Sequence, residues 1–326
     1  MSAQVKPKRI ILCLTQIEHL DGVKTILSRA GHLRCHTELE ELEAAQLIRS
    51  TNPYALYVNP NDMKFKLGQN VLKDSVRVIA TSSTGLNHID MDYCKEHKID
   101  VISNTRDLVL LEQITSTAEH AFCLMLSLLR NVRKSAEDVH RYRWRCYDFL
   151  GRQVNRLTIG VVGYGRLGKM FARYANAFGA KVVVYDPYVQ TIPNCYQRSD
   201  DLVGIFRNCD VVSLHVHVSP ETTAMVNESI LSQGDGVYLV NTSRGEIVDE
   251  DAIVGALQSG NLAGYGTDVL EDELGGDLTS SPIIGISISG EYNVLVTPHI
   301  AGATIDAQGL AYEATARKLS SYMREH

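Results

Sequence analysis

A glycine pattern at a strand–helix junction constrains the fold more than any other feature of this chain. The apolar run Leu157 to Val162 is followed by Gly163, Gly165 and Gly168, spaced as G-x-G-x-x-G, and then by residues with helical periodicity. In such a junction the first glycine permits a tight turn, the second lets backbone approach a pyrophosphate, and the third lets the helix pack on the strand. The N–H groups at the start of the helix can bind phosphates. The pattern predicts a dinucleotide-binding βαβ unit.

The next predicted strand ends beside an acidic residue. The run Lys181 to Tyr185 is followed by Asp186, about twenty residues beyond the glycine pattern. A carboxylate there can accept hydrogen bonds from a ribose diol and repels a 2′-phosphate, so it favours NAD over NADP. Without a cofactor, Asp186 would simply be a turn residue before Pro187.

Strand-like apolar runs alternate with helical patterns over the whole chain, which is typical of parallel α/β sheets. A chain of 326 residues is long enough for two domains that each bury a core. The predicted strands are Ile10 to Leu14, Tyr54 to Val58, Val76 to Ala80, Val101 to Ile102, Leu157 to Val162, Lys181 to Tyr185, Val211 to Val216, Val237 to Val240, Gly264 to Val269 and Val294 to Val296. The predicted helices are Leu20 to Ala30 (ended by Gly31), Glu38 to Ser50, Leu111 to Arg141 and Ala307 to Met323. The later strands match a complete doubly wound nucleotide-binding sheet, and we expect the last helix to return to the first domain.

The predicted helix from about Leu111 to Arg141 is unusually long and is apolar on nearly every side between Ala121 and Leu129. Helices of this kind are usually buried, so we expect it to lie between domains or subunits.

Composition excludes several classes of function. The net charge of −6 offers no basic stripe for nucleic acid. The apolar run Ile10 to Leu14 is too short for a signal peptide, and Ala121 to Leu129 is too short to span a bilayer. The seven cysteines are scattered, which predicts neither a disulfide framework nor a metal site and favours a reducing, cytoplasmic location.

Three polar residues follow the ends of the later predicted strands, where open α/β sheets bind their ligands. Arg244 could grip a substrate carboxylate, His299 could exchange a hydroxyl proton near neutral pH, and the carboxylate of Glu273 could orient the imidazole. Taken singly, each has an ordinary alternative: a surface ion pair for Arg244, a solvated acidic loop for Glu273, and a packed or surface residue for His299.

Five motifs in a fixed order carry a resemblance to a known family. They are Gly163-Tyr-Gly-Arg-Leu-Gly168, Asp210-Val-Val-Ser-Leu-His215, Asn241-Thr-Ser-Arg-Gly245, Asp268-Val-Leu-Glu-Asp-Glu273 and Thr297-Pro-His-Ile-Ala-Gly302. In these motifs the chain resembles the D-isomer-specific 2-hydroxyacid dehydrogenases, a family that includes D-3-phosphoglycerate dehydrogenases. The resemblance runs from about Leu56 to Ala307.

The resemblance implies a role for each matching residue. Arg244 would bind the substrate carboxylate and keto group, His299 would be the acid/base with Glu273 as its partner, and Asp268 would contact the nicotinamide carboxamide. In the loop Ser83 to Asp90, the N–H groups of Thr84 and Gly85 would hold the substrate carboxylate, and His88 would be a loop residue rather than a catalyst. The implied NAD contacts are Gly163, Gly165, Arg166, Leu167, Gly168, Asp186, Val216, Thr242, Ser243, Asp268 and Gly302.

The resemblance also implies an architecture. A Rossmann NAD-binding domain, residues 106–303, would be inserted into a smaller flavodoxin-like substrate domain made of residues 1–105 and 304–326, which closes on it. The enzyme would be a homodimer joined through the long helix near residues 111–141. Because the sequence ends at His326, we expect no C-terminal regulatory domain.

The chain departs from the family at several positions. His217 and Leu274 stand where prolines are usual, and the segment 275–293 matches the family poorly. Asn59 stands where phosphoglycerate dehydrogenases commonly carry an arginine, although Lys64 and Lys66 could supply positive charge nearby. These departures disfavour phosphoglycerate as the substrate.

Two other functions fit the same motifs. The chain could be a non-catalytic NAD-sensing protein, as are co-repressors built on this fold, because fold does not determine function. It could also oxidise another donor, such as formate or phosphite. Glu273 beside His299 argues against formate, and the sequence does not identify the acid that is the substrate.

Overall fold

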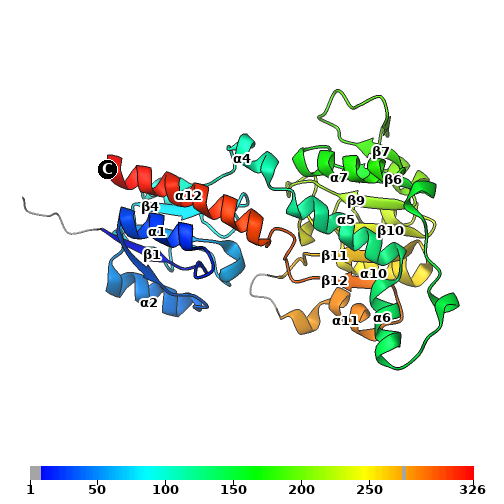
Figure 1. Ribbon diagram of the computed structural model, residues 1–326, viewed down its shortest axis with the longest axis horizontal. Helices are drawn as coiled ribbons and strands as arrows, with labels where there is room; N and C mark the ends of the chain where they lie inside the picture. Colours follow the sequence, from blue (N-terminus) through cyan, green and yellow to red (C-terminus); the bar gives the residue numbers. More distant parts are fainter. Residues whose placement is uncertain (1–8, 274–276) are drawn as a thin grey trace, which may run out of the picture. The chain divides into compact units, whose positions relative to one another are not determined.

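The computed structural model describes residues 9–273 and 277–326, and the chain divides into two compact units (Figure 1). Unit 1 takes the chain up to Ile114 together with Thr304–His326, and unit 2 is Thr115–Ala303. The sequence predicts a boundary between residues 105 and 106. The structure divides the chain after Ile114, so helix α4 (Leu108–Gln113) belongs to unit 1. Leu274 and the beginning of the segment 275–293 lie outside the described residues.

Unit 2 is built on a seven-stranded parallel sheet of order β12-β11-β10-β9-β6-β7-β8. The first strand in sequence, β6, lies between β7 and β9, which makes the sheet doubly wound as predicted. Its strands are β6 (Thr158–Val162), β7 (Lys181–Tyr185), β8 (Gln197–Arg198), β9 (Val211–Leu214), β10 (Val237–Asn241), β11 (Leu262–Thr267) and β12 (Val294–Val296).

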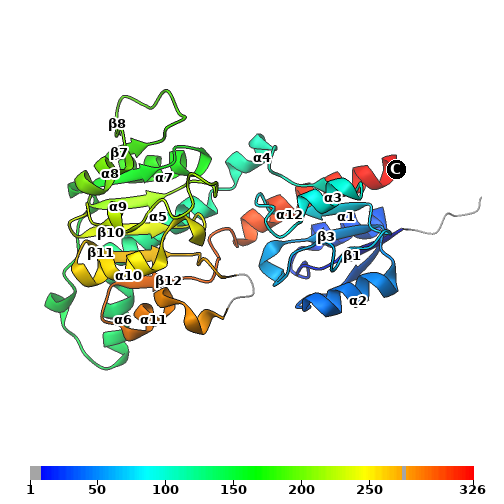
Figure 2. The same ribbon diagram turned by 180° about the vertical axis from the view of Figure 1, so that it is seen from behind.

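Helices cover both faces of this sheet and bury two apolar cores. Helices α5 (Ser116–Leu129) and α7 (Arg166–Ala177) form one core with the sheet, visible in Figure 1. On the opposite face lie α8 (Leu202–Asn208), α9 (Glu228–Leu231), α10 (Glu250–Ser259) and α11 (Pro282–Ser289), seen from behind in Figure 2. Burial on both faces explains why the strands read as continuous apolar runs.

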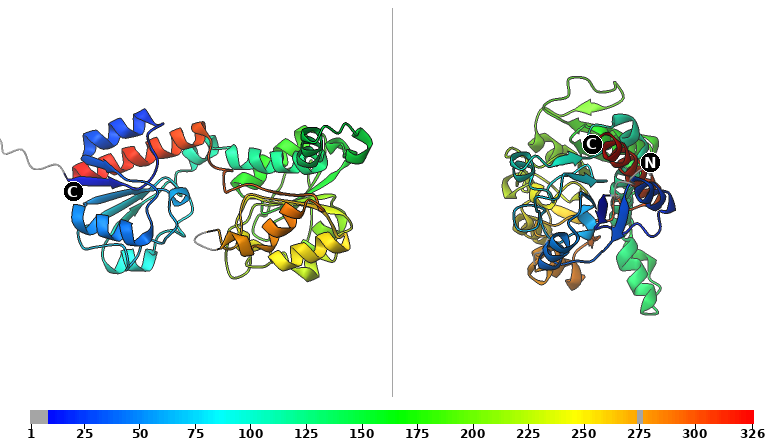
Figure 3. Two further views of the ribbon diagram at one scale, coloured as in Figure 1. Left: turned by 90° about the horizontal axis from the view of Figure 1, so that it is seen from below. Right: turned by 90° about the vertical axis from the view of Figure 1, so that its left-hand side faces the viewer.

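Unit 1 is a second parallel α/β sandwich, with five strands ordered β2-β1-β3-β4-β5. The strands are β1 (Ile10–Cys13), β2 (His32–Cys35), β3 (Ala55–Val58), β4 (Val78–Thr81) and β5 (Asp100–Ile102). Helices α1 (Asp21–Ala30) and α12 (Ile305–Glu325) pack together on one face, while α2 (Glu41–Thr51) and α3 (Met91–Glu96) cover the other (Figure 3). Strand β2 was missed in the sequence because it lies at the sheet edge, where none of its four residues is fully buried and it lacks a continuous apolar run.

The prediction of one long helix over Leu111 to Arg141 is wrong. The segment forms three helices: α4, α5 and α6 (Val132–His140). Ile114 is extended after α4, and Asn131 adopts a left-handed conformation with φ 51° between α5 and α6. A left-handed residue interrupts the helical ladder, and asparagine tolerates this conformation better than most residues.

None of the helices in the described part of the chain has the length and apolar character that a bilayer span requires. The same residues include no group of three His, Cys, Asp or Glu side chains arranged to hold a metal ion.

Candidate active site

The glycine turn between β6 and α7 has the geometry that the sequence pattern predicts. Gly163 has φ +88°, and a Cβ on it would lie 2.5 Å from the carbonyl oxygen of His215. A Cβ on Gly168 would overlap the carbonyl oxygen of Gly163. Both glycines are therefore required by the protein's own backbone, the first for the turn and the second for packing of α7 against it.

Two features at the carboxyl ends of the strands in unit 2 fit a dinucleotide. Gly165, at the N-terminus of α7, has an ordinary negative φ, and a Cβ on it would meet nothing within 4 Å. The protein's own packing therefore does not require a glycine there, whereas close approach of a pyrophosphate does. Thr242, which follows β10, has a buried hydroxyl oxygen without a hydrogen-bond partner among the described residues. Buried polar atoms usually have partners, so this hydroxyl fits a bound ligand.

Asp186 organises the backbone around the glycine turn. Its Oδ2 accepts a hydrogen bond from the N–H of Tyr164 at 2.7 Å, and its Oδ1 accepts one from the N–H of Tyr188 at 2.9 Å. The carboxylate thus holds both the turn after β6 and the turn in which Asp186 itself lies. This agrees with the interpretation of Asp186 as a turn residue before Pro187. Binding of a ribose by the same carboxylate stays a prediction.

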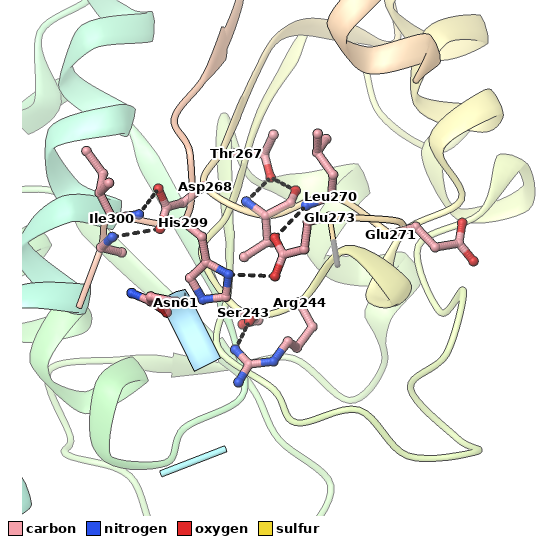
Figure 4. Close-up of polar contacts among 12 residues, drawn as sticks. Asn61, Ser243, Arg244, Thr267, Asp268, Leu270, Glu271, Glu273, His299 and Ile300 are labelled. Atoms are coloured by element: carbon pink, nitrogen blue, oxygen red, sulfur yellow. Dashed lines mark hydrogen bonds and ion pairs between the residues drawn. The ribbon is translucent and has the colours of Figure 1, made fainter. Parts of the chain in front are cut away.

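His299 and Glu273 form a hydrogen-bonded pair. They follow β12 and β11, two neighbouring parallel strands, and the Nδ1 of His299 lies 2.5 Å from Oε1 of Glu273 (Figure 4). The other carboxylate oxygen accepts from the N–H of Leu270 at 3.3 Å, which holds Glu273 in place. An imidazole whose Nδ1–H faces a carboxylate leaves Nε2 as the atom that can exchange a proton. The pair can therefore act in general acid–base catalysis.

Arg244 follows β10, the next strand of the sheet, and its side chain extends below the His299 ring in Figure 4. Its Nη1 donates to the carbonyl oxygen of Ser243 at 2.7 Å, while its own carbonyl accepts from the buried side chain of Asn241 at 2.8 Å. The backbone around Arg244 is thus fixed, and its guanidinium forms no ion pair with any of residues 9–273 and 277–326.

Gly245 allows the Arg244 loop to lie against the Glu273 loop. A Cβ on Gly245 would overlap the backbone of Leu270 and Glu271. Any other residue at this position would push the two loops apart. Gly245 had no role of its own predicted from the sequence, although its place directly after Arg244 in the motif was a signal that it is needed.

Asp268 holds the turn that carries His299. This carboxylate is 1% exposed and accepts hydrogen bonds from the N–H groups of Ile300 and Ala301, at 2.9 and 2.7 Å. It also accepts one from the hydroxyl of Thr297 at 2.5 Å. Its oxygens are directed at this turn, so contact with a nicotinamide carboxamide stays a prediction. Neither the Thr297 side chain nor His120, which contacts Thr297, had a role predicted from the sequence.

The other predicted cofactor residues of unit 2 also lie beyond the carboxyl ends of its strands, either in loops or in the first turn of α7. Ser243 donates to the carbonyl of Leu214 at 2.8 Å, which links the loop after β10 to the end of β9. Arg166 and Leu167 begin α7, Val216 lies just beyond β9, and Gly302 lies just beyond β12.

In unit 1 the predicted substrate loop follows β4. The N–H of Gly85 donates to Ser83 Oγ at 3.1 Å, so within the loop it is already engaged. The carbonyl of Thr84 accepts from Thr105 at 3.2 Å, which anchors the loop. His88 is buried and bonded to Thr81, at 3.0 Å, as expected of a structural residue.

Asn59 and Asp62 lie beyond β3 on the same edge of unit 1. Asn59 donates to Ser82 Oγ at 2.8 Å. The Asp62 carboxylate accepts from the hydroxyl of Thr15 and from the N–H of Gln16. Lys64, the nearby residue considered as a source of positive charge, forms a salt bridge with Glu40 at 3.0 Å.

Known proteins share both the sequence and the fold. The family profile described as "D-isomer specific 2-hydroxyacid dehydrogenase, NAD binding domain" matches residues 122–301. A hydroxypyruvate reductase of Thermotoga maritima is 32% identical over 235 residues, covering 72% of this chain and 73% of that enzyme. A D-3-phosphoglycerate dehydrogenase of Mycobacterium leprae is 32% identical over 240 residues, covering 72% of this chain and 43% of that enzyme. The match thus spans less than half of that longer enzyme.

Solved structures extend the likeness over nearly the whole chain. The structure of D-lactate dehydrogenase from Aquifex aeolicus, complexed with NAD and lactic acid, has a TM-score of 0.79 and 30% sequence identity. The match covers 97% of this chain and 96% of that one.

Proposed function

The chain belongs to the family of D-isomer-specific 2-hydroxyacid dehydrogenases, and on this premise we propose that it transfers a hydride between NAD(H) and the α carbon of a small 2-hydroxy or 2-keto acid of D configuration. One observation carries the proposal. The hydrogen-bonded pair of His299 and Glu273 lies on the loops next to that of Arg244, on the sheet that also carries the glycine turn.

The residues of unit 2 fit NAD, which when bound supplies or accepts the hydride. The N–H groups at the start of α7 would bind the pyrophosphate, with Gly165 leaving room for it. The free hydroxyl of Thr242 would find its partner in the cofactor, and Asp186 would disfavour a 2′-phosphate.

The side chains of the protein would donate the proton and bind the carboxylate of the substrate. In reduction of a keto acid, protonated His299 would donate from Nε2 to the keto oxygen, while Glu273 stabilises the imidazolium through Nδ1. The guanidinium of Arg244 would pair with the substrate carboxylate and polarise the keto group. The N–H of Thr84 in unit 1 would add a donor to the carboxylate, and that of Gly85 could do so only by sharing its proton with Ser83.

We further propose that the substrate carries no phosphate. A second anionic group would need a cation, but Asn59 is neutral and engaged with Ser82, and Lys64 is paired with Glu40, which leaves the exposed Lys66 as the other cation of this segment. The carboxylate of Asp62, at the same edge of the unit 1 sheet, would repel a phosphate. Relatives of the chain include both phosphoglycerate dehydrogenases and a hydroxypyruvate reductase, and these charges favour the second kind of substrate.

NADH oxidation at neutral pH tests the proposal with glyoxylate, pyruvate, hydroxypyruvate, phosphohydroxypyruvate, 2-ketoglutarate and bulkier keto acids. We expect turnover of an unphosphorylated acid, reduced by roughly 10²- to 10⁴-fold in His299→Ala. His32→Ala, which changes an exposed histidine of unit 1, is the control and should be fully active. NADH binding without turnover of any acid would contradict the proposal and favour the sensing role.

We also propose a homodimer. The resemblance implies an interface through residues 111–141, and we place the interface instead at the residues that follow α6. Helix α5 contributes to the core of unit 2, so its apolar character needs no partner subunit. The most exposed large apolar side chains of the described residues follow α6: Tyr142 is fully exposed, and Trp144, the only tryptophan, is 88% exposed. Nearby Tyr147 and Leu150 are exposed as well, and an exposed apolar group of this kind is typical of an interface.

Light scattering during gel filtration tests the dimer. Trp144→Glu should shift the mass from two chains to one at micromolar concentration. Tyr188→Glu, which changes an aromatic residue of unit 2 that is 80% exposed, should leave the dimer intact. A wild-type protein that elutes with the mass of one chain would contradict the proposal.

A cytoplasmic location is part of the same proposal. All seven cysteines are unpaired, as expected in a reducing compartment. Fractionation of cells with an antibody to the protein tests it, and recovery with secreted or periplasmic proteins would contradict it.

A further inference from the structure

A second imidazole contacts the turn that carries His299. His120 belongs to α5, and its Nε2 lies 2.9 Å from Oγ1 of Thr297 and 3.6 Å from Oδ1 of Asp268. Its side chain is 19% exposed. His120 and Asp268 thus form an imidazole–carboxylate pair of their own, distinct from the pair of His299 and Glu273.

The hydrogen bonds determine the direction of each donor in this group. The hydroxyl of Thr297 has one proton, which it donates to the carboxylate of Asp268 at 2.5 Å. Thr297 Oγ1 can therefore only accept from His120, so Nε2 of His120 carries a proton. The chain of donors runs from His120 through Thr297 to Asp268, and the turn approaches the same carboxylate through the N–H groups of Ile300 and Ala301.

This chain of hydrogen bonds holds a strained backbone. His299 has φ +53°, which is uncommon for any residue with a side chain. Its N–H donates to the carbonyl of Asp268 at 2.9 Å, so Asp268 holds the turn by backbone and side chain together. Such conformations persist only where the surroundings determine them strongly, and they concentrate at active sites.

We propose that His120 and Thr297 are positioning residues for His299: their hydrogen bonds orient the Asp268 carboxylate, which holds the turn at residues 299–301 in the conformation that aims the His299 ring at the substrate. The inference rests on the proposed function, since it concerns the same acid–base group. Neither residue would touch the reacting atoms. Loss of either would let the turn relax, and a small displacement of a catalytic group can reduce the rate strongly.

Two pairs of variants test this role. Thr297→Val removes the hydroxyl at nearly constant shape, and Thr297→Ser keeps it. His120→Ala removes the donor, while His120→Gln keeps an N–H donor near the position of Nε2. We expect kcat with the best keto acid to fall about tenfold or more in Thr297→Val and His120→Ala and to return to within about threefold of wild type in Thr297→Ser and His120→Gln. The dissociation constant of NADH should change less than about twofold in all four.

The outcomes separate this inference from the proposed function. If the wild-type enzyme reduces keto acids but folded Thr297→Val has unchanged kcat, the positioning role is wrong and the function stands. The role is also wrong if Thr297→Ser and His120→Gln are as impaired as the other two variants. If His120→Ala does not fold, the Thr297 pair and His120→Gln decide the matter. A wild-type enzyme inactive on every acid, with NADH bound, overturns the function itself.

Discussion

The two sheets of this protein share an architecture but differ in what they carry at the carboxyl ends of their strands. In unit 2 that edge carries the glycine turn, an unpartnered Thr242 hydroxyl and the pair of His299 and Glu273. In unit 1 the corresponding edge carries neutral groups bonded to one another, such as Asn59 and Ser82, together with carboxylates such as Asp62. Two parallel sheets bind ligands at the same kind of edge. The residues in the loops at that edge determine whether it can transfer a proton or only bind a substrate by its shape and charge.

Among substitutions that compare the two edges, the largest effect is expected from changing the carboxylate of Glu273 in unit 2. Glu273→Gln retains the shape of the side chain but removes the charge that stabilises protonated His299. We expect kcat to fall by about 10²-fold, with little change in NADH affinity. Steady-state kinetics and NADH fluorescence titration measure both. Full activity in this variant would show that the Glu273 carboxylate is not needed for proton transfer at the edge of unit 2.

The glycine turn should be the next most sensitive feature. Gly165→Val adds a side chain where the protein leaves space, so we expect NADH to bind at least about tenfold more weakly while thermal stability is retained. Gly255→Ala on α10 is the matched control, because a Cβ there also meets nothing within 4 Å. It should raise the free energy of unfolding by roughly 0.5–1 kcal/mol and leave NADH affinity unchanged. Equal NADH affinity in both variants would exclude the turn from the cofactor site.

Asp62→Asn makes the equivalent carboxylate-to-amide change in unit 1, and we expect it to alter selectivity rather than rate. With the negative charge removed, kcat/KM for phosphohydroxypyruvate should rise about fivefold relative to hydroxypyruvate, which corresponds to about 1 kcal/mol of repulsion between the half-buried Asp62 carboxylate and a phosphate. The measurement is the ratio of the two kcat/KM values at low salt. A ratio identical to that of wild type would remove Asp62 from the substrate's surroundings.

A histidine beside the glycine turn should make the stability of the protein depend on pH. Burial lowers the pKa of His215 to about 3, so the folded protein keeps this ring neutral while the unfolded chain protonates it below its ordinary pKa of 6.5. Its contribution to stability is therefore full above pH 6.5 and is lost as the pH falls toward 3, by at most about 1.4 kcal/mol per pH unit. Between pH 7 and pH 5, the midpoint of urea unfolding should fall less in His215→Asn than in wild type. Parallel losses in both proteins would contradict this assignment.

Local patterns were enough to predict the parts that depend on neighbouring residues. The strand, glycine turn and helix from Thr158 to Ala177 follow from apolar runs, glycine spacing and helical periodicity, which are properties of consecutive residues. The same reasoning failed at Asn131, where a single left-handed residue divides a continuous apolar pattern into two helices. Periodicity does not register one residue's φ, so the break could not be read from the pattern.

The sequence by itself determined the doubly wound sheet, its glycine turn and the three short motifs that carry Arg244, Glu273 and His299. Only the tertiary structure decided that Glu273 reaches His299, that Gly245 lets two loops touch, and that His120 reaches the His299 turn from α5. The physical reason is that turns and periodic runs are local, whereas these contacts join residues distant in sequence. They form only when parallel strands bring their carboxyl ends to one edge and a helix packs across them.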